Sequence, residues 1–438
     1  MNDEASQPNK KTNVREGESM STESELRRVA WLVFALVAIA NFGNFYVYDS
    51  IGPVADLLQR QRGFSDTQIG MLNAIYSLPN VVLVLVGGIL VDRFGASRMA
   101  VWTGALCLVG ALLTAFGPNF ATMAAGRLLF GVGAETLNLT ALAAVAIYFA
   151  GANVAFAMGL MLGLGRAGSF SADMSPTWFH AAYAQGWQPP LVIAAAIAAT
   201  CFLGSLGYRW IDLRVRGRKA TSAATHQAFV VSDLWRFGKA YWFLLILCVL
   251  WYAVILAFRS TFSIKYFQHA HGLDLATAGA MNSYVFLAAM FSTPVLGWVC
   301  DRTGRYAPLL AFGAVLLPIA LLIVALTQWS LWIATALIGV SYSLVPAVMW
   351  PLASKIVPQA RFGTAIGLMW VVQNLGIASA NLIAGHLNDA AGASAANPAG
   401  YLPMMGFFGL SSALGFLFAL LLWGTAGRRE HEAAVHAR

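Results

Sequence analysis

Two consecutive apolar segments decide the fold: GRLLFGVGAETLNLTALAAVAIYF at residues 126–149 and VAFAMGLMLGLGRAGSFSADM at residues 154–174. Each is long enough to cross the hydrocarbon core of a bilayer as a helix. Each carries one charge near its middle, Glu135 in the first and Arg166 in the second. A turn near residue 152 joins them, so an antiparallel pair would place both charges at similar depth. Charges at that depth are costly and usually mark a functional site.

The Glu135–Arg166 pair has two interpretations. A structural ion pair could clamp the two helices together. Alternatively, the two side chains could face a water-filled cavity and bind a ligand. We favour the second interpretation, because charged side chains inside a membrane usually line pathways.

The composition is that of a polytopic membrane protein. Of 438 residues, 59% are hydrophobic and 11% are charged, whereas soluble domains carry about 25% charged residues. The net charge of +8 follows from basic loops, so no nucleic-acid partner is expected. The four cysteines are far apart and predict no metal site. We find no nucleophile–base pattern, and we expect neither an enzyme nor a cofactor.

The apolar runs predict an all-α membrane protein with twelve transmembrane helices in two pseudo-symmetric six-helix bundles. The expected organisation is a disordered terminus at 1–27, an N-terminal bundle at 28–211, a linker at 212–240, a C-terminal bundle at 241–425 and a tail at 426–438. The expected spans are 30–50, 68–91, 99–117, 121–149, 154–180, 189–211, 241–266, 275–300, 307–326, 329–354, 362–387 and 401–424.

The distribution of basic residues predicts the orientation of these spans. With the N-terminus inside, 20 of the 27 Lys and Arg residues fall in cytoplasmic segments, two in outer loops and five within the expected spans. Such a bias places both termini in the cytoplasm. Short loops and Ala-rich spans favour a bacterial inner membrane.

A short motif occurs twice in the chain. GGILVDRFGASR, from residue 87, follows the second expected span, and GWVCDRTGR, from residue 297, follows the eighth. The shared frame is G-x-x-x-D-R-x-G. Two parallel six-helix halves with a substrate site between them are a known transporter architecture.

The first copy resembles the signature loop of the major facilitator superfamily, and the second copy is shorter. Arg127, with Gly131 and Gly133, resembles the fourth-helix motif of that superfamily. An Asp at a helix end can meet the positive N-terminus of a neighbouring helix, and Arg can hold carboxylates or terminal carbonyls. Such contacts could close and release the inner face. The expected gating or structural charges of the two loops are Asp92, Arg93, Arg98, Asp301, Arg302 and Arg305.

A narrower resemblance is to the lysosomal dipeptide facilitators of this superfamily. It covers YVYDSIGP, YSLPNVVLVLVGGILVDRFG, GRLLFGVGAETL, GLGRAGS, YSLVPAVMWPLASKIVP and GTAIGLMWVVQNLGIASANLIAG. The resemblance implies a carrier of small peptides. It also implies that Glu135 holds the substrate ammonium group and Arg166 the carboxylate. An accessory subunit is left open, and the chain itself is treated as a monomer.

The residues support that implication. A dipeptide is a zwitterion, and one fixed anion with one fixed cation suits it. Arg is well shaped for bidentate carboxylate binding. Gln373 and Asn374 lie in an apolar segment and could bind a peptide amide or join two helices.

Other polar residues near the outer side leave alternatives open. Asp49 either gates or is a solvated carboxylate at a helix end, the latter being slightly favoured. Arg127 is expected to pair with an acid, Asp49 or Asp173. Arg259 either faces the cavity or extends outward to the interface. Four outer histidines, His180, His269, His271 and His386, have no evident acid partner, so proton sensing is not favoured.

The favoured function is therefore alternating-access transport of dipeptides, as a uniporter or a proton-linked carrier. One alternative is a proton-driven exporter of drugs or organic anions. Another is a non-transporting membrane sensor. The expected partners are a small zwitterionic substrate and the lipid bilayer.

Overall fold

The computed structural model describes residues 10–149, 154–215, 236–327 and 330–436, and no strand occurs among them. Twelve long helical segments confirm the all-α membrane architecture. In chain order the helices are α1 (Lys10–Asp49), α2 (Ile51–Arg62), α3 (Asp66–Phe94), α4 (Ala96–Phe116), α5 (Phe120–Tyr148), α6 (Val154–Trp178), α7 (His180–Gln185), α8 (Gln188–Val215), α9 (Lys239–Ala257), η2 (Phe258–Phe262), α10 (Ser263–His271), α11 (Leu275–Thr303), α12 (Tyr306–Leu326), α13 (Leu331–Ile356), η3 (Gln359–Arg361), α14 (Phe362–Ala390), η4 (Pro398–Tyr401) and α15 (Leu402–His436).

Length and hydropathy identify the spanning segments. Within the described ranges, ten helical segments are long and apolar enough to cross a membrane. Two further long helices, α3 with 29 residues and α6 with 25, pack among them. The seventh span is composite, since α9, the π-helical turn η2 and α10 run on without a break.

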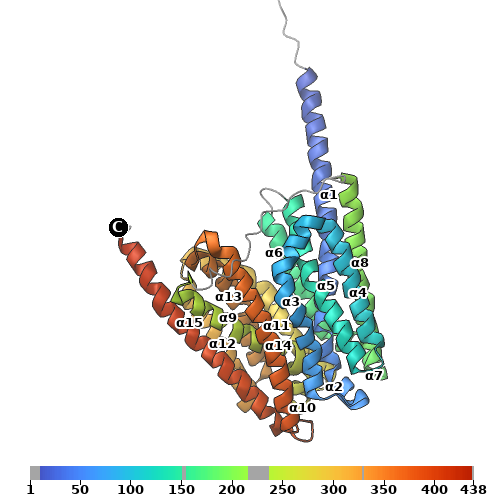
Figure 1. The fold of residues 1–438 in the computed structure, drawn as a ribbon, viewed down its shortest axis with the longest axis vertical. Coiled ribbons are helices and arrows are strands. Elements are labelled where there is room, and N and C mark those ends of the chain that lie inside the picture. Colours follow the sequence, from blue (N-terminus) through green and yellow to red (C-terminus); the bar gives the residue numbers. More distant parts are fainter. Residues whose placement is uncertain (1–9, 150–153, 216–235, 328–329, 437–438) are drawn as a thin grey trace, which may run out of the picture.

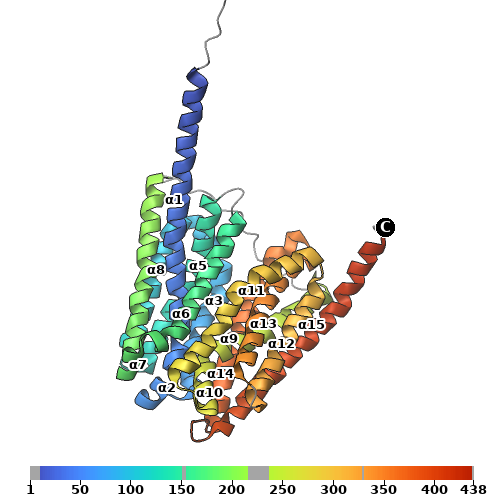
Figure 2. The same ribbon diagram turned by 180° about the vertical axis from the view of Figure 1, so that it is seen from behind.

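The two halves of the chain have separate apolar cores. One cluster of buried side chains draws on residues 30–211 and the other on residues 237–422. We call these parts the N-half and the C-half. Figures 1 and 2 show them as two helical bundles side by side, whose ribbons diverge toward the end where the N-terminal helix projects.

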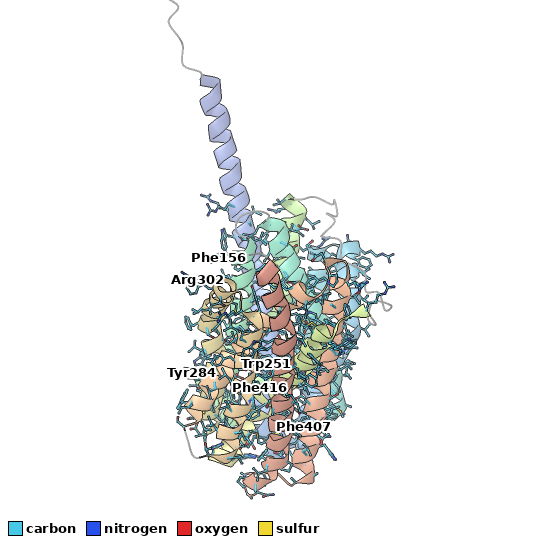
Figure 3. The ribbon with its side chains drawn as sticks, turned by 90° about the vertical axis from the view of Figure 1, so that its left-hand side faces the viewer. Phe156, Trp251, Tyr284, Arg302, Phe407 and Phe416 are labelled. Carbon is cyan, nitrogen blue, oxygen red and sulfur yellow. The ribbon has the colours of Figure 1, made fainter. Side chains whose placement is uncertain are left out.

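The two ends of the molecule differ in what they carry. Helices α2, α7 and α10 lie at one end, which we call the α2 end (Figure 1). The turns at Gly95 and Gly304 lie at the other, which we call the signature end. In Figure 3 the labelled Arg302 lies toward the signature end and Trp251 near mid-height.

Two helix ends differ from the expected boundaries. Residues 1–9 lie outside the described part, and α1 begins at Lys10, within the terminal segment expected at 1–27. Extending an existing helix avoids the cost of nucleating a new one, which explains the continuation. Similarly, α8 continues to Val215, beyond the expected linker boundary at 212. Residues 216–235 of that linker lie outside the described part.

Glycines allow the closest helix contacts. A Cβ built on Gly131 of α5 would lie 2.4 Å from the carbonyl oxygen of Tyr76, and one on Gly168 of α6 would lie 2.3 Å from that of Phe42. Any larger residue would force these helices apart. Gly159 and Gly163 of α6 do not serve this purpose, since nothing lies within 4 Å of a Cβ there.

The repeated motif ends in the same backbone feature in both halves. Gly95 has φ +84° and Gly304 has φ +65°, a left-handed region that favours glycine. Their amides donate to Val91 O at 2.8 Å and Cys300 O at 2.9 Å. The final glycine of D-R-x-G therefore ends a helix in each half.

Candidate functional site

Glu135 and Arg166 lie on adjacent helices, α5 and α6, and both are partly exposed. Among the described residues no ion pair joins them. Glu135 Oε1 instead accepts a hydrogen bond from the hydroxyl of Tyr76 at 3.3 Å and from Asn80 Nδ2 at 3.4 Å. The guanidinium carbon of Arg166 lies 4.2 Å from the ring centroid of Tyr342, on α13 of the C-half. The structural clamp between the two charges is thus absent.

Asn374 and Gln373 have different surroundings although they are neighbours on α14. Asn374 Oδ1 accepts from Asn80 Nδ2 at 3.5 Å and so joins the two halves beside Glu135. Gln373 is buried within the C-half, where Cys248 Sγ lies 3.7 Å from its Oε1. Asn374 therefore lies near the central charges, whereas Gln373 contacts α9.

A second charge cluster lies toward the α2 end and was not foreseen as a unit. Arg259 Nη2 is 2.8 Å from Asp49 Oδ1 and 3.4 Å from Asp173 Oδ2. The three side chains are each no more than 2% exposed. Asp49 and Asp173 belong to the N-half and Arg259 to the C-half, so this triad joins the halves.

The triad corrects the expectations for Asp49 and Arg259. Asp49 is not a solvated helix-end carboxylate, and Arg259 does not extend outward to the interface. Arg259 lies on η2, a single π-helical turn inserted between α9 and α10. Such turns often occur at functional positions. Its backbone carbonyl also accepts from Asn282 Nδ2 at 3.1 Å, and Asn282 donates to Asp173 at 2.9 Å.

Arg127 does not pair with Asp49 or Asp173, which corrects a further expectation. Its guanidinium donates to Val47 O at 3.0 Å and Tyr48 O at 3.1 Å. These carbonyls belong to the last turn of α1, where intrahelical partners run out. A cation there also suits the negative end of the helix dipole. Arg127 therefore stabilises the end of α1.

Further polar contacts join the halves at the α2 end. Lys265 of α10 forms a buried ion pair with Asp66 of α3. His269 Nε2 lies 2.8 Å from Asp56 Oδ1, so this histidine does have an acid partner, from α2. Sequence reasoning missed both pairs because each joins segments about two hundred residues apart.

A carboxylate from α14 caps the N-terminus of α3. Asp389 accepts hydrogen bonds from the amides of Asp66 and Thr67, both at 2.8 Å. The first amides of a helix lack intrahelical partners and carry partial positive charge. Asp389 therefore ties the C-terminus of α14 to the N-terminus of α3 across the two halves.

The signature end has a different character. Arg93, Arg98, Arg302 and Arg305 are exposed, and none forms an ion pair with a described residue. The side chains of Asp92 and Asp301 lie outside the described part. The expected gating role of these six residues stays a prediction.

Metal and disulfide chemistry have no site among the described residues. No group of three or more His, Cys, Asp or Glu side chains there could hold a metal ion. The four cysteines are buried and form no disulfide. The charged and amide side chains described above are suited to binding a ligand and to joining the two halves.

A two-bundle helical membrane protein with partly exposed charges between its halves is the architecture of a secondary transporter. The family comparison makes this specific: residues 37–381 match the model of the Major Facilitator Superfamily. The chain belongs to that family, and it is a multi-pass membrane transporter rather than an enzyme.

Individual relatives refine the comparison. The chain is 29% identical over 411 residues to the protein named lysosomal dipeptide transporter MFSD1 from Danio rerio, covering 91% of this chain and 87% of that protein. It is 29% identical over 405 residues to the human protein of the same name, covering 90% and 85%. It is 24% identical over 378 residues to a probable sulfoacetate transporter, SauU, of Cupriavidus necator, covering 77% and 82%.

A solved structure supports the fold. The crystal structure of the nucleoside transporter NupG, in a point-mutant form, matches with a TM-score of 0.73 at 14% identity. The match covers 88% of this chain and 99% of that chain. At this identity the likeness concerns the fold alone.

Proposed function

We propose that this transporter carries dipeptides, with Glu135 binding the substrate ammonium group and Arg166 the carboxylate. One observation carries the proposal: two opposite charges lie on neighbouring helices, partly exposed and not paired with each other. A carboxylate and a guanidinium that no described residue neutralises suit a ligand that bears both signs. The names of the relatives from Danio rerio and human agree with this substrate class.

Neighbouring polar groups extend this proposed site. Asn80 and Tyr76 donate to Glu135 and favour its charged form, which an ammonium group requires. Asn374 lies beside them and is suited to a peptide amide. Gln373 is buried within the C-half beside Cys248, so we assign it a weaker role.

The proposed transport mechanism is alternating access between the two halves. The α2 end is held by the Arg259 triad, the Lys265–Asp66 pair and the Asp389 cap. The described residues of the signature end form no ion pair between the halves. We therefore assign this structure to a state closed at the α2 end. In the opposite state the signature loops would make the closing contacts.

The charge bias supports an orientation with both termini in the cytoplasm and the α2 end outside. The four native cysteines are buried, so single added cysteines can report on access. Ala395→Cys, in an exposed loop at the α2 end, should react with an impermeant maleimide in intact cells. Ser222→Cys in the linker should react only after lysis. The reverse pattern would overturn the orientation.

A thermal-shift screen of the purified transporter tests the substrate. Dipeptides should raise the melting temperature, whereas single amino acids and common drugs should do so less. Uptake of a labelled dipeptide into proteoliposomes should follow, and adding a pH gradient separates uniport from proton coupling. No stabilisation and no uptake with any dipeptide would overturn the proposal.

An organic-anion substrate is the second candidate. Arg166 has no carboxylate partner among the described residues, and one relative is named a probable sulfoacetate transporter. An anion would need Arg166 but not Glu135. Stabilisation by sulfoacetate that survives Glu135→Gln, without stabilisation by dipeptides, would favour this candidate.

A further inference from the structure

The guanidinium of Arg166 rests on an aromatic surface supplied by the opposite half of the protein. Its central carbon is 4.2 Å from the centroid of Tyr342 on α13 and 5.9 Å from that of Phe286 on α11. A cation within about 6 Å of a ring centroid is attracted by the ring. The position of Arg166, an N-half residue, is therefore influenced by two C-half side chains.

The ring of Tyr342 is itself held in a fixed orientation. Trp251 stacks on it at 6.1 Å with an interplanar angle of 20°, and Phe286 meets it edge-on at 5.5 Å. Trp251 is anchored in turn, since its Nε1 donates to Ser341 Oγ at 3.1 Å. Ser341 donates to Gly313 O at 2.8 Å. Tyr342 is 7% exposed and Trp251 is 1% exposed. The surface beneath Arg166 is thus preorganised.

A guanidinium held over an aromatic ring can keep its N–H donors available to a ligand. The N–H donors of Arg lie in the plane of the group and can grip a carboxylate in bidentate fashion while a ring covers the face. Arg166 makes no ion pair with any described residue, in contrast to Arg259. The Tyr342 ring can therefore hold the cation in place without using the donors that a ligand needs.

Phe286 also contacts Arg259 of the buried triad toward the α2 end. The guanidinium carbon of Arg259 lies 3.9 Å from the centroid of Phe286, and Phe286 is packed against Tyr342. Since both rings belong to the C-half, the support of Arg166 depends on the two halves being together at this level. Separation of the halves would remove it.

We propose that Tyr342 is a positioning residue for Arg166, which it orients so that the guanidinium edge meets a substrate carboxylate. This inference rests on the proposed function for the identity of the ligand. Tyr342 acts through the face of its ring. Its hydroxyl forms no hydrogen bond with a described residue, so a phenylalanine at this position should support Arg166 equally well.

Paired variants at residue 342 test the role of the ring face. Tyr342→Phe should bind dipeptides within about twofold of the unmodified protein. Tyr342→Leu should weaken binding of dipeptides with a free carboxylate about tenfold, or about 1.4 kcal/mol, and should leave binding of C-terminally amidated dipeptides nearly unchanged. Phe408→Leu is a matched control, because this buried C-half aromatic packs on Phe258 and Phe407. Equal losses for acid and amide, or a loss in Tyr342→Phe, would overturn the proposal.

A second measurement needs no substrate. Melting temperatures of Arg166→Met, Tyr342→Leu and the double variant form a cycle that reports the coupling of the two side chains. The double variant should be clearly less destabilised than the sum of the single variants. Additive effects would overturn the role of Tyr342 even if dipeptides bind. Failure of the unmodified protein to bind any dipeptide would instead reject the proposed function. The melting temperatures of the three variants would then still show whether Tyr342 holds Arg166.

Discussion

Two sets of charged side chains in this protein differ in burial and in pairing. At the α2 end Arg259 is buried between Asp49 and Asp173, with each side chain at most 2% exposed. Glu135 and Arg166, in contrast, are partly exposed and have no charged partner among the described residues. A buried charge must be paired to be tolerated, whereas a charge that awaits a ligand has to stay unpaired. The contrast separates residues that hold the halves together from residues suited to a substrate.

The largest effect should come from breaking the buried triad. Arg259→Met leaves Asp49 and Asp173 buried without their cation and should destabilise the protein by about 3–5 kcal/mol. Thermal unfolding in detergent measures this. Adding Asp49→Asn and Asp173→Asn removes all three charges and should restore part of the stability. If Arg259→Met melts like the unmodified protein, the triad does not hold the halves together.

Arg166 should behave in the opposite manner. Arg166→Ala should leave the ligand-free protein folded with a nearly unchanged melting temperature. Any lowering of the melting temperature should come only from the lost contact with Tyr342. The variant should abolish stabilisation by dipeptides, which amounts to about 2.7 kcal/mol when the ligand is at a hundred times its Kd. The measurement is a thermal-shift titration with the same peptide. Persistent stabilisation would remove Arg166 from the proposed site.

Glu135 should show a smaller and more selective effect. Glu135→Gln keeps the shape of the side chain and its contacts with Tyr76 and Asn80 but removes the charge. It should weaken binding of dipeptides with a free amine about tenfold and spare N-acetylated dipeptides, because only the former bring an ammonium group. Titrations with both peptides provide the comparison. Equal losses would argue against the ammonium contact.

The smallest effect concerns the cap at the α2 end. Asp389→Ala removes the carboxylate that binds the first amides of α3 and should cost about 0.5–2 kcal/mol, as for other helix caps. Because the cap joins the halves, the variant should also open the α2 end more often. Faster reaction of a cysteine placed at Thr67 would report this opening. The matched Thr67→Cys protein with Asp389 intact gives the reference rate.

Much of the fold could be predicted from local sequence. The number and order of the spans follow from apolar runs, since the free energy of placing each side chain in lipid adds up along a helix. The glycines of the repeated motif belong to a recurring frame, and Gly95 and Gly304 do adopt positive φ. The helical continuation over residues 10–27 could not be predicted, because a polar composition favours disorder whereas an adjoining long helix can extend at low cost.

The partners of the charged residues were much harder to predict. The expected pairing of Arg127 with an acid was wrong, and the buried pairs of Lys265 and His269 were missed. Arg127 was recognised as important because a cation inside an apolar segment is unusual. Its actual partners include backbone carbonyls, which carry no signal in a sequence. The π-helical turn that holds Arg259 likewise has no local signature in FRSTF.

The sequence by itself determined that this chain is a helical membrane protein with a repeated motif, and that Glu135 and Arg166 each lie near the middle of an apolar segment. Hydropathy and repetition are properties of neighbouring residues, so they can be read along the chain. Only the tertiary structure decided that Arg259 forms buried ion pairs with Asp49 and Asp173. It also decided that Arg166 lies over the ring of Tyr342, with no charged partner among the described residues. Asp49 and Arg259 are 210 residues apart, and such pairs form only when the two bundles pack against each other.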